Sequence, residues 1–432
     1  MNAIFFAIVA VAFVTAGWHQ LHWLPAAGTA APMAALTTAM VKTAGGAVEL
    51  AIGLIGVMTL FLGLVKVAEA GGLLAILARL IRPLMVRLFP EVPPGHPAMG
   101  AMILNISANA LGLGNAATPF GIRAMQELDK LNPRPGTATD PMILFLAINT
   151  SSITLLPTGV IALRAAAGST DPAGILPTTL FATLCSTAAA IVAAKLYKRF
   201  SRPVTIEDAA TLGVAAAADP DPDPEQLPAE AEQAYPLWVS GLAMLAVIGF
   251  IPLTILYGRA IAPWVIPGLM IGFLTFGILR RVRVYEVFVE GAKEGFQVAV
   301  KIIPYLVAIL VAVGMFRASG AMQAMVGFLG PWTGKIGLPA EALPMALLRP
   351  LSGSGAYGIL ASIIKNPAIG PDSYTGYLVS TFQGSTETTF YVLAVYFGAV
   401  QVRRLRYALP AALTADLVGI SAAVAICLYL FG

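Results

Sequence analysis

The residue of this chain best suited to chemistry is Glu387, the carboxylate of an otherwise uncharged polar cluster, Gln383–Thr388 (QGSTET), inside an apolar stretch. A charged side chain at the centre of a bilayer costs roughly 3 kcal/mol on insertion scales, so such residues are retained mainly for function. We expect Glu387 to bind a coupling proton or cation, or a donor group of a substrate. The alternative is a structural carboxylate that is protonated or paired with an arginine.

Arg349 opens a second glycine-rich polar stretch, Arg349–Gly358 (RPLSGSGAYG). It could pair with Glu387 or hold an anionic group of a substrate, and it could equally extend its guanidinium to the membrane interface. Asp416 is a further carboxylate in an apolar stretch near the end of the chain, where a packing role competes with a binding role. Arg349 is therefore a possible charge partner of Glu387.

The stretch Asn105–Pro119 (NISANALGLGNAATP) places polar side chains and glycines deep in the apolar chain. The apolar run before it, Pro97–Leu111, is shorter than the roughly twenty residues that a helix needs to cross a bilayer. We expect Gly112 and Gly114 to end this helix and Thr118–Pro119 to start the next one, with the threonine as N-cap. The product is a re-entrant hairpin whose tip offers helix N–H groups to a polar or anionic ligand, although the small residues could also serve tight helix packing.

Two predicted spans carry polar interruptions beside these hairpins. Asn149–Ser152 (NTSS) interrupts the span Pro141–Leu163, and Gln383–Thr388 interrupts the span Tyr377–Val400. Irregular backbone at membrane depth persists only where protein or a water-filled cavity covers it, so we expect the interruptions and the hairpin tips to form one site. For each single side chain, a hydrogen bond between helices is the alternative. The neutral residues expected to line the site are Asn105, Ser107, Asn109, Asn115, Thr118, Asn149, Thr150, Ser151, Ser352, Ser354, Tyr357, Gln383, Ser385 and Thr386.

The composition is typical of a polytopic membrane protein. Of 432 residues, 58% are hydrophobic and only 11% are charged, compared with roughly 25% charged in a soluble domain. The net charge of +4 reflects basic loops beside the membrane, so no nucleic-acid partner is expected. His19 and His22 are spaced to share a metal, but beside Trp18 and Trp23 an interfacial role is expected instead. Walker, HExxH and GxSxG motifs are missing, so we expect neither an enzyme nor a metal site.

We expect an all-α polytopic membrane fold with about nine spans and two re-entrant hairpins. The first membrane half is expected at 1–203 and the second at 236–432. Between them, 204–235 is rich in Asp, Glu and Pro and has no Lys or Arg, which is typical of a flexible linker. Leu73–Leu88 is amphipathic and should lie along the membrane surface. Besides the two interrupted spans, the expected spans are 4–17, 46–68, 176–196, 236–256, 262–279, a segment ending at 316, and 411–430.

The two halves have the same order of elements, and their basic residues predict opposite orientations. If the Lys and Arg clusters after positions 196, 279 and 400 are cytoplasmic, span 141–163 runs outward and span 377–400 runs inward. The first hairpin then enters from the cytoplasm and the second from outside. Inverted repeats whose broken helices meet near the midplane are typical of secondary transporters.

Long stretches of both halves resemble known bacterial proteins. The stretch 54–169, from LIGVMTLFLGLVKVAEAGGL to FLAINTSSITLLPTGVIALRAAAGS, closely resembles spore maturation protein A. The stretch that begins RPLSGSGAYG and contains STFQGSTETTFYVLAVYFGAVQVRR resembles spore maturation protein B, so the chain resembles a fusion of the two. Both are members of the nucleoside recognition (Gate) domain family, which is related to concentrative nucleoside transporters and to the membrane domain of ferrous iron transporters. The resemblance implies an alternating-access fold with two re-entrant hairpins.

The sequence therefore predicts a secondary-active transporter or permease of a small polar solute, nucleoside-like or anionic. We expect a multi-pass protein of the bacterial cytoplasmic (inner) membrane, with Glu387 binding the coupling H⁺ or Na⁺ and no other cofactor. The expected partners are the small-molecule substrate, the lipid bilayer and further copies of the chain. The alternative is a non-transporting membrane scaffold or regulator of cell-envelope or spore maturation, which would tolerate loss of the Glu387 carboxylate.

Overall fold

The computed structural model describes residues 2–25, 30–112, 114–201 and 235–432. The described residues form helices joined by loops and contain no β-strand, which confirms the predicted all-α class. All but the last residue of the predicted linker 204–235 lie outside the described residues. The domain boundaries expected there stay a prediction.

The first half contains two long helices, a helical hairpin, a broken helix and a final unbroken helix. In order, these elements are α1 (Asn2–Leu21), α2 (Pro32–Ala70), α3 (Leu73–Leu88), α4 (Pro97–Ala110), α5 (Gly114–Lys130), α6 (Asp140–Ser151), α7 (Thr158–Ala166) and α8 (Leu176–Phe200).

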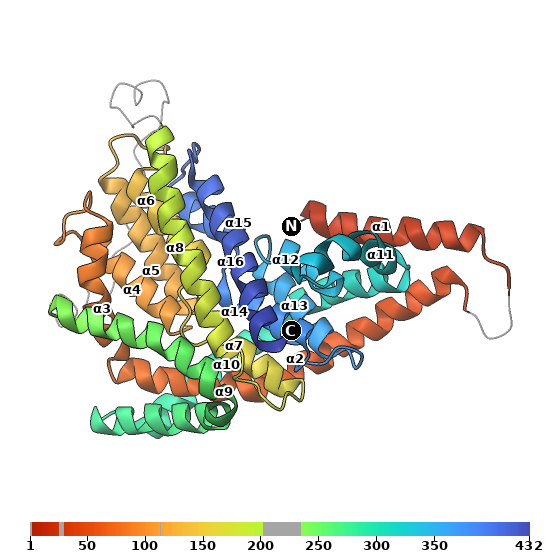
Figure 1. Cartoon of the computed structure of the whole chain (residues 1–432), viewed down its shortest axis with the longest axis horizontal. Coiled ribbons are helices and arrows are strands. Elements are labelled where there is room, and N and C mark those ends of the chain that lie inside the picture. Colours follow the sequence, from red (N-terminus) through yellow and green to blue (C-terminus); the bar gives the residue numbers. More distant parts are fainter. Residues whose placement is uncertain (1, 26–29, 113, 202–234) are drawn as a thin grey trace.

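The second half repeats this order, and Figure 1 shows α4–α8 and α14–α16 gathered in one bundle, from which α1 and α11 extend to one side. Its hairpin is α12–α13, and its broken helix is α14 followed by α15 and a π-helical turn, η5. The elements are α9 (Leu237–Leu279), α10 (Val284–Ala318), α11 (Ala321–Thr333), η3 (Gly334–Ile336), η4 (Ala340–Ala342), α12 (Leu343–Leu348), α13 (Gly353–Ile364), α14 (Tyr374–Ser385), α15 (Thr389–Val392), η5 (Leu393–Phe397) and α16 (Ala408–Phe431).

Equivalent long helices of the two halves pack side by side in opposite directions. In the pair α2 and α10, a Cβ atom at Gly295 would lie 2.8 Å from the carbonyl oxygen of Met58. A Cβ atom at Gly314 would lie 2.5 Å from Oγ1 of Thr43. Residue numbers therefore rise along α10 as they fall along α2, and glycine allows the two backbones to approach closely.

The last helices of the two halves, α8 and α16, are also antiparallel. Near one end, the hydroxyls of Tyr197 and Thr414 lie 2.9 Å apart. Near the other, Thr381 of α14 joins the two helices, with its hydroxyl 2.7 Å from that of Thr178 and 3.5 Å from Sγ of Cys427. Two pairs of equivalent elements thus run in opposite directions, as the basic residues of the sequence predict.

A sharp bend follows the second helix of each half. α3 turns by 69° from α2 at Gly72, and α11 turns by 82° from α10 at Gly320. These glycines have φ of +88° and +86°, in the left-handed region that side chains with a Cβ disfavour. The location of Leu73–Leu88 along the membrane surface stays a prediction.

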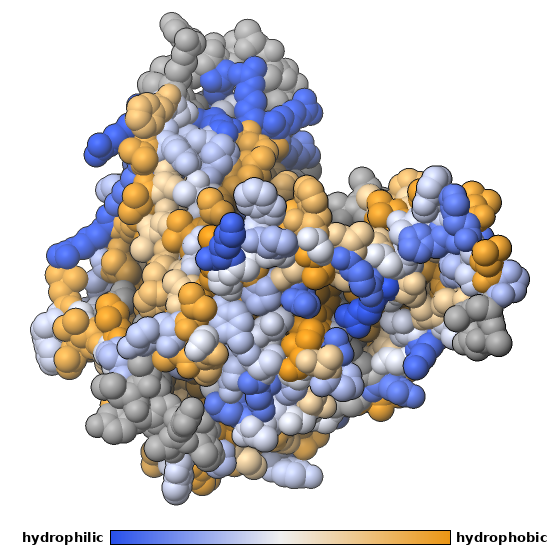
Figure 2. Space-filling view, turned by 45° about the vertical axis from the view of Figure 1, so that its right-hand side comes forward, coloured by the Kyte–Doolittle hydropathy of each residue, from blue (hydrophilic) through white to orange (hydrophobic). Residues whose placement is uncertain are grey.

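Outward-facing apolar side chains cover much of the molecule. Figure 2 shows them spread over the face in view, with strongly hydrophilic side chains gathered at its upper end and in smaller groups across its middle and right. Trp264, Phe328 and Trp332 are all more than two-thirds exposed, which a membrane protein explains by contact with lipid. By length and composition, α8 and α16 can cross a membrane, and the described residues hold up to four spans if each bent pair is counted as one span. The full number of nine spans stays a prediction.

Buried apolar side chains form two large clusters, and four elements pass from one cluster to the other at polar residues. We call the four stretches that contain these polar residues the polar layer. It comprises 149–159 of the first broken segment, 383–391 of the second, 183–189 of α8 and 416–422 of α16. The flanking apolar pairs are Ile148 and Val160, Phe382 and Val392, Ala182 and Ala190, and Ala415 and Ala423.

Two predicted helix boundaries are wrong. Thr118–Pro119 does not begin a helix, because α5 already starts at Gly114, directly after the turn at Gly112. The spans expected at 236–256 and 262–279 fall within one element, α9. The polar Gly258–Arg259 interrupts the apolar character of this stretch without ending the helix.

The bend glycines provide a test of the fold. Replacing Gly72 by alanine should lower the free energy of unfolding by about 1 kcal/mol, because the left-handed conformation is unfavourable with a Cβ. A Cβ atom would meet nothing within 4 Å at this position, so the effect isolates backbone strain. Thermal unfolding of the purified protein in detergent measures it.

Gly45→Ala is the matched control. Gly45 lies in the helical part of α2, and its Cβ atom would also meet nothing within 4 Å. This substitution should leave stability unchanged or raise it slightly, since alanine favours helix. Equal destabilisation by both variants would contradict the assigned bend.

Candidate functional site

The two polar interruptions lie against each other in the polar layer. The backbone N–H of Glu387 donates to the carbonyl oxygen of Thr150 at 2.9 Å. The hydroxyl of Ser151 lies 3.0 Å from that of Thr187 on α8. The helices α6 and α14 therefore end side by side, in the middle of an otherwise apolar bundle.

The tip of the first hairpin packs on the first interruption. Gly112 has φ of +75°, and a Cβ atom there would lie 2.6 Å from the carbonyl oxygen of Leu156, so glycine is required. Nδ2 of Asn109 donates to Oδ1 of Asn149 at 2.9 Å. This amide pair joins α4 of the hairpin to the end of α6.

Tyr396, in the π-helical turn η5, joins the same pair of elements to the second half. Its hydroxyl accepts a hydrogen bond from Nδ2 of Asn105 at 3.0 Å and donates to Oδ1 of Asn149 at 3.3 Å. Gly121 on α5 leaves room for its ring, which a Cβ atom would overlap. Sequence reasoning missed Tyr396. The π-turn that contains it is visible only in the structure, and such turns are frequent at functional sites.

The second hairpin reaches both interruptions. Ser352 caps α13 by accepting the backbone N–H of Gly355 at 3.1 Å. A Cβ atom at Gly353 would lie 2.8 Å from Oγ1 of Thr388, so this tip touches the second interruption. The hydroxyl of Tyr357 donates to the carbonyl oxygen of Gly159, at the far end of the stretch 149–159 that contains the first interruption.

Arg349 holds the broken end of α14. Its guanidinium donates to the carbonyl oxygens of Phe382 (3.4 Å), Gln383 (3.2 Å) and Thr386, which the helix break leaves without intrahelical partners. Only 3% of the Arg349 side chain is exposed, and Nη2 lies 3.8 Å from Oε2 of Glu387. The structure therefore favours the charge-partner interpretation of Arg349, since most of its donors are engaged by the protein itself.

Glu387 differs from its partner in accessibility. Its side chain is 43% exposed, whereas that of Arg349 is almost fully buried. The pair thus places an accessible carboxylate next to a buried cation at the helix break.

Several expected site residues carry a buried polar atom that has no hydrogen-bond partner among the described residues. Such atoms are rare in folded proteins, because an unpaired buried donor or acceptor is costly. The atoms are Oδ1 of Asn105, Oγ of Ser107, Oε1 of Gln383 and Oγ of Ser385. Of the remaining expected residues, Thr118 is half-buried on α5, Ser354 is half-buried on α13, and the side chain of Asn115 lies outside the described part of the chain.

Comparison with known proteins places this geometry in a family. A family model described as nucleoside recognition (Gate) matches residues 51–167 and 299–403, slightly more than half of the chain. The chain belongs to the nucleoside recognition (Gate) family. The two matched ranges contain both hairpin tips and both interruptions.

Two curated relatives are similar to different parts of this Gate-family chain. Spore maturation protein B of Bacillus subtilis (strain 168) is 48% identical over 167 residues, which are 39% of this chain and 93% of that protein. Spore maturation protein A of the same organism is 49% identical over 154 residues, 36% of this chain and 79% of that protein. A solved structure, CNTnw in an inward-facing substrate-bound state, is 13% identical with a TM-score of 0.45, covering 98% of this chain and 91% of that one.

Two clusters that sequence reasoning missed tie the halves of the Gate-family chain together. At one end of the bundle, Arg164 of α7 contacts Asp372, just before α14, at 3.0 Å, and its guanidinium lies 4.2 Å from the ring centroid of Tyr377. At the other end, Arg406 contacts Asp140, the first residue of α6, at 2.7 Å. Each aspartate begins one broken helix, and each arginine follows the break of the other.

The carboxyl group of Asp372 lies in a loop and is held in its ionised form. Burial alone would raise its pKa, but hydrogen bonds from Ser169 and Thr170 and the charge of Arg164 outweigh burial and lower the pKa below the usual 3.8. A lowered folded pKa means that the carboxylate contributes its full stability above the unfolded pKa, and that this contribution is lost as the pH falls through the folded value.

Asp372→Asn should therefore destabilise the protein at neutral pH, by about 3 kcal/mol, because it removes the carboxylate in direct contact with the fully buried Arg164, whose other acidic neighbour, Asp171, contacts the guanidinium through its backbone carbonyl. Glu91→Gln is the control, since Glu91 and its partner Lys198 are both 46% exposed and should contribute less than about 1 kcal/mol. Unfolding midpoints at pH 7 and near pH 3 measure both effects. An Asp372→Asn effect that does not shrink at the lower pH would contradict the assigned role.

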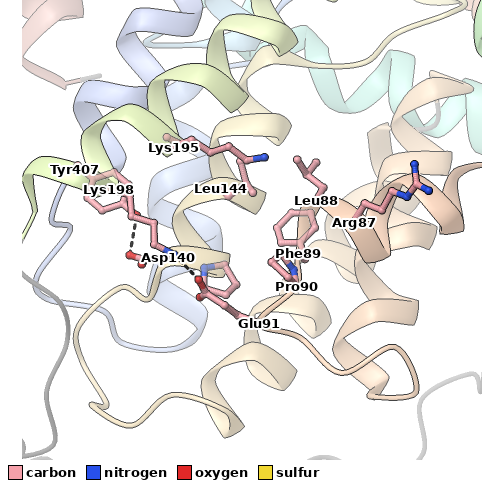
Figure 3. Close-up of a pocket in the computed structure, with 12 residues that line it drawn as sticks. Arg87, Leu88, Phe89, Pro90, Glu91, Asp140, Leu144, Lys195, Lys198 and Tyr407 are labelled. Atoms are coloured by element: carbon pink, nitrogen blue, oxygen red, sulfur yellow. Dashed lines mark hydrogen bonds and ion pairs between the residues drawn. The ribbon is translucent and has the colours of Figure 1, made fainter.

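Two cavities lie away from the polar layer. One, of about 120 Å³, is enclosed by the ends of α3 and α8 and the starts of α6 and α16, where Lys198 bridges Glu91 and Asp140 (Figure 3). The other, of about 250 Å³, lies between α10, α11 and α13. None of the residues expected from the sequence lines either cavity.

Proposed function

We propose that this Gate-family protein is a secondary-active transporter or permease that binds a small polar solute where the two hairpins adjoin the polar layer. The observation that carries the proposal is that Asn105 and Ser107 of the first hairpin, and Gln383 and Ser385 of the second broken helix, each hold a buried polar atom with no partner among the described residues. A solute with matching donors and acceptors would satisfy these atoms. Broken helices with cavity-facing polar groups are the usual substrate sites of inverted-repeat transporters.

The chemistry of the polar layer fits a neutral, nucleoside-like solute better than an anion. Asparagine, glutamine and hydroxyl side chains offer both donors and acceptors, as the edges of a nucleobase or a sugar do. The buried cation beside the polar layer, Arg349, donates hydrogen bonds to backbone carbonyl oxygens and so has few donors left for an anion. The description of the family as nucleoside recognition supports the same class.

Glu387 is proposed as the coupling residue for H⁺ or Na⁺, because it is the accessible carboxylate at the helix break. This role requires neither catalysis nor another cofactor. We place the protein in the bacterial cytoplasmic membrane, with its Lys and Arg clusters on the inner side. Further copies of the chain are proposed as partners, through the exposed apolar helix faces.

The competing proposal is a membrane scaffold or regulator. The printed names of both relatives, spore maturation proteins A and B, favour it, since they refer to a developmental process. A scaffold has no need of the Glu387 carboxylate or of the unpartnered polar atoms. The two proposals therefore differ in what they require of the polar layer.

Thermal stabilisation of the purified protein separates them. A panel of nucleosides, nucleobases, amino acids, dicarboxylates and muropeptide fragments is screened at two pH values, with and without sodium. A ligand at about 100 times its dissociation constant should stabilise the folded state by about 2.7 kcal/mol. We expect a nucleoside-like hit that Glu387→Gln weakens at least tenfold.

Glu286→Gln, at an exposed position near the start of α10, is the control and should leave ligand binding unchanged. A hit with equal affinity in the wild type and Glu387→Gln would remove Glu387 from the coupling role. The absence of any stabilising ligand across the panel would favour the scaffold.

A further inference from the structure

Asp416 is a second carboxylate of the polar layer, and it is buried. It lies on α16 between the two apolar clusters, with 4% of its surface exposed. Oδ2 accepts a hydrogen bond from Oγ1 of Thr389 at 2.6 Å, directly after the break of the second broken helix. Oδ1 has no hydrogen-bond partner among the described residues.

The groups around Asp416 do not balance an ionised carboxylate. From α8, Ser186 donates its hydroxyl to the carbonyl oxygen of Ala415, the residue before Asp416. The charged group that acts on Asp416 is Arg349, which also interacts with a further carboxylate, Glu387. Arg349 already lies 3.8 Å from Glu387, and no ion pair of Asp416 within 4 Å occurs in the described part of the chain. One positive charge thus serves two carboxylates, of which Asp416 is the more buried.

An isolated ionised carboxylate in an apolar interior is strongly unfavourable, so one of the two carboxyl groups must carry a proton. Glu387 is the exposed carboxylate and the one that lies 3.8 Å from Arg349, so we assign the proton to Asp416. Asp416 has a single donor and an unpaired oxygen, and a proton on Oδ1 makes it neutral.

We propose that Asp416 is the buried proton-binding site of the transport cycle and that Arg349 is shared between it and Glu387. This inference rests on the proposed transport function and makes the coupling ion a proton. When Asp416 is protonated, Arg349 pairs with Glu387 and with the carbonyl oxygens at the end of α14. When Asp416 releases its proton to water through the accessible Glu387, its new charge attracts Arg349 and withdraws it from those carbonyls. The break of α14, and with it the polar layer, then loosens.

Infrared difference spectroscopy of the purified full-length protein tests the protonation without any substrate. A protonated carboxylic acid has a C=O stretching band that an ionised carboxylate lacks. We expect such a band at neutral pH in the wild type, its loss in Asp416→Asn, and its retention in Glu387→Gln. A band that persists in Asp416→Asn, or that only Glu387→Gln removes, would overturn the assignment.

Thr389→Val guards against misfolding of the Asp416 variant. It removes the hydroxyl that donates to Oδ2 while keeping the shape of the side chain. The band of a protonated Asp416 should then shift without disappearing, and an unshifted band would place the proton elsewhere.

A second measurement tests coupling. For a ligand found by thermal stabilisation, proton uptake or release on binding is measured in buffers of different ionisation enthalpy. We expect proton exchange in the wild type and none in Asp416→Asn. Exchange that survives in Asp416→Asn would contradict the proposed site, whereas a panel without ligands would contradict the transport function and leave the infrared result decisive for the protonation.

Discussion

The second broken helix depends on one buried cation. Ending α14 in an apolar interior leaves the carbonyl oxygens of Phe382 and Gln383 without partners, and neither lipid nor apolar side chains can supply them. Arg349 does so from the tip of the second hairpin. The position of the hairpin and the break of the helix therefore depend on each other. Neither can shift without breaking the hydrogen bonds between the guanidinium and the carbonyl groups. This coupling explains why a costly charge is kept at this depth.

The two halves are joined at both ends of the bundle as well as in the middle. The contacts of Arg164 with Asp372 and of Arg406 with Asp140 link the start of each broken helix to the segment after the break of the other. In the middle, the N–H of Glu387 bonds to Thr150. Ties at three levels oppose any separation of the halves across the polar layer.

Local patterns in the sequence predicted much of this arrangement, and long-range contacts were beyond them. The polar clusters at Asn149–Ser152 and Gln383–Thr388 and the glycines of the hairpins were recognisable because each violates the apolar background of its own segment. Tyr396 was missed because an aromatic residue in an apolar helix gives no such signal. The ion-pair clusters were missed because each partner is far from the other in the sequence, and the two meet only when the halves pack together. The helix start expected at Thr118 was wrong because a favourable cap motif was outweighed by the turn at Gly112.

Different side chains bond to the carbonyl groups beside the two helix breaks. This difference gives the two halves different roles. At the first break, neutral side chains bond to the carbonyls of their own helix: Nδ2 of Asn149 donates to Phe145 at 3.0 Å, and Oγ of Ser151 to Ile148 at 2.8 Å. At the second break, Oγ1 of Thr386 bonds to the carbonyl oxygen of Phe382 in the same way, and the buried guanidinium of Arg349 adds bonds to Phe382 and Gln383 and lies beside Glu387. Charge is therefore concentrated in the second half of the polar layer, and the first half offers amides and hydroxyls alone. If both serve one transport cycle, the first half contributes mainly to solute recognition, and the second half is where an ion can change the strength with which the broken helix is held.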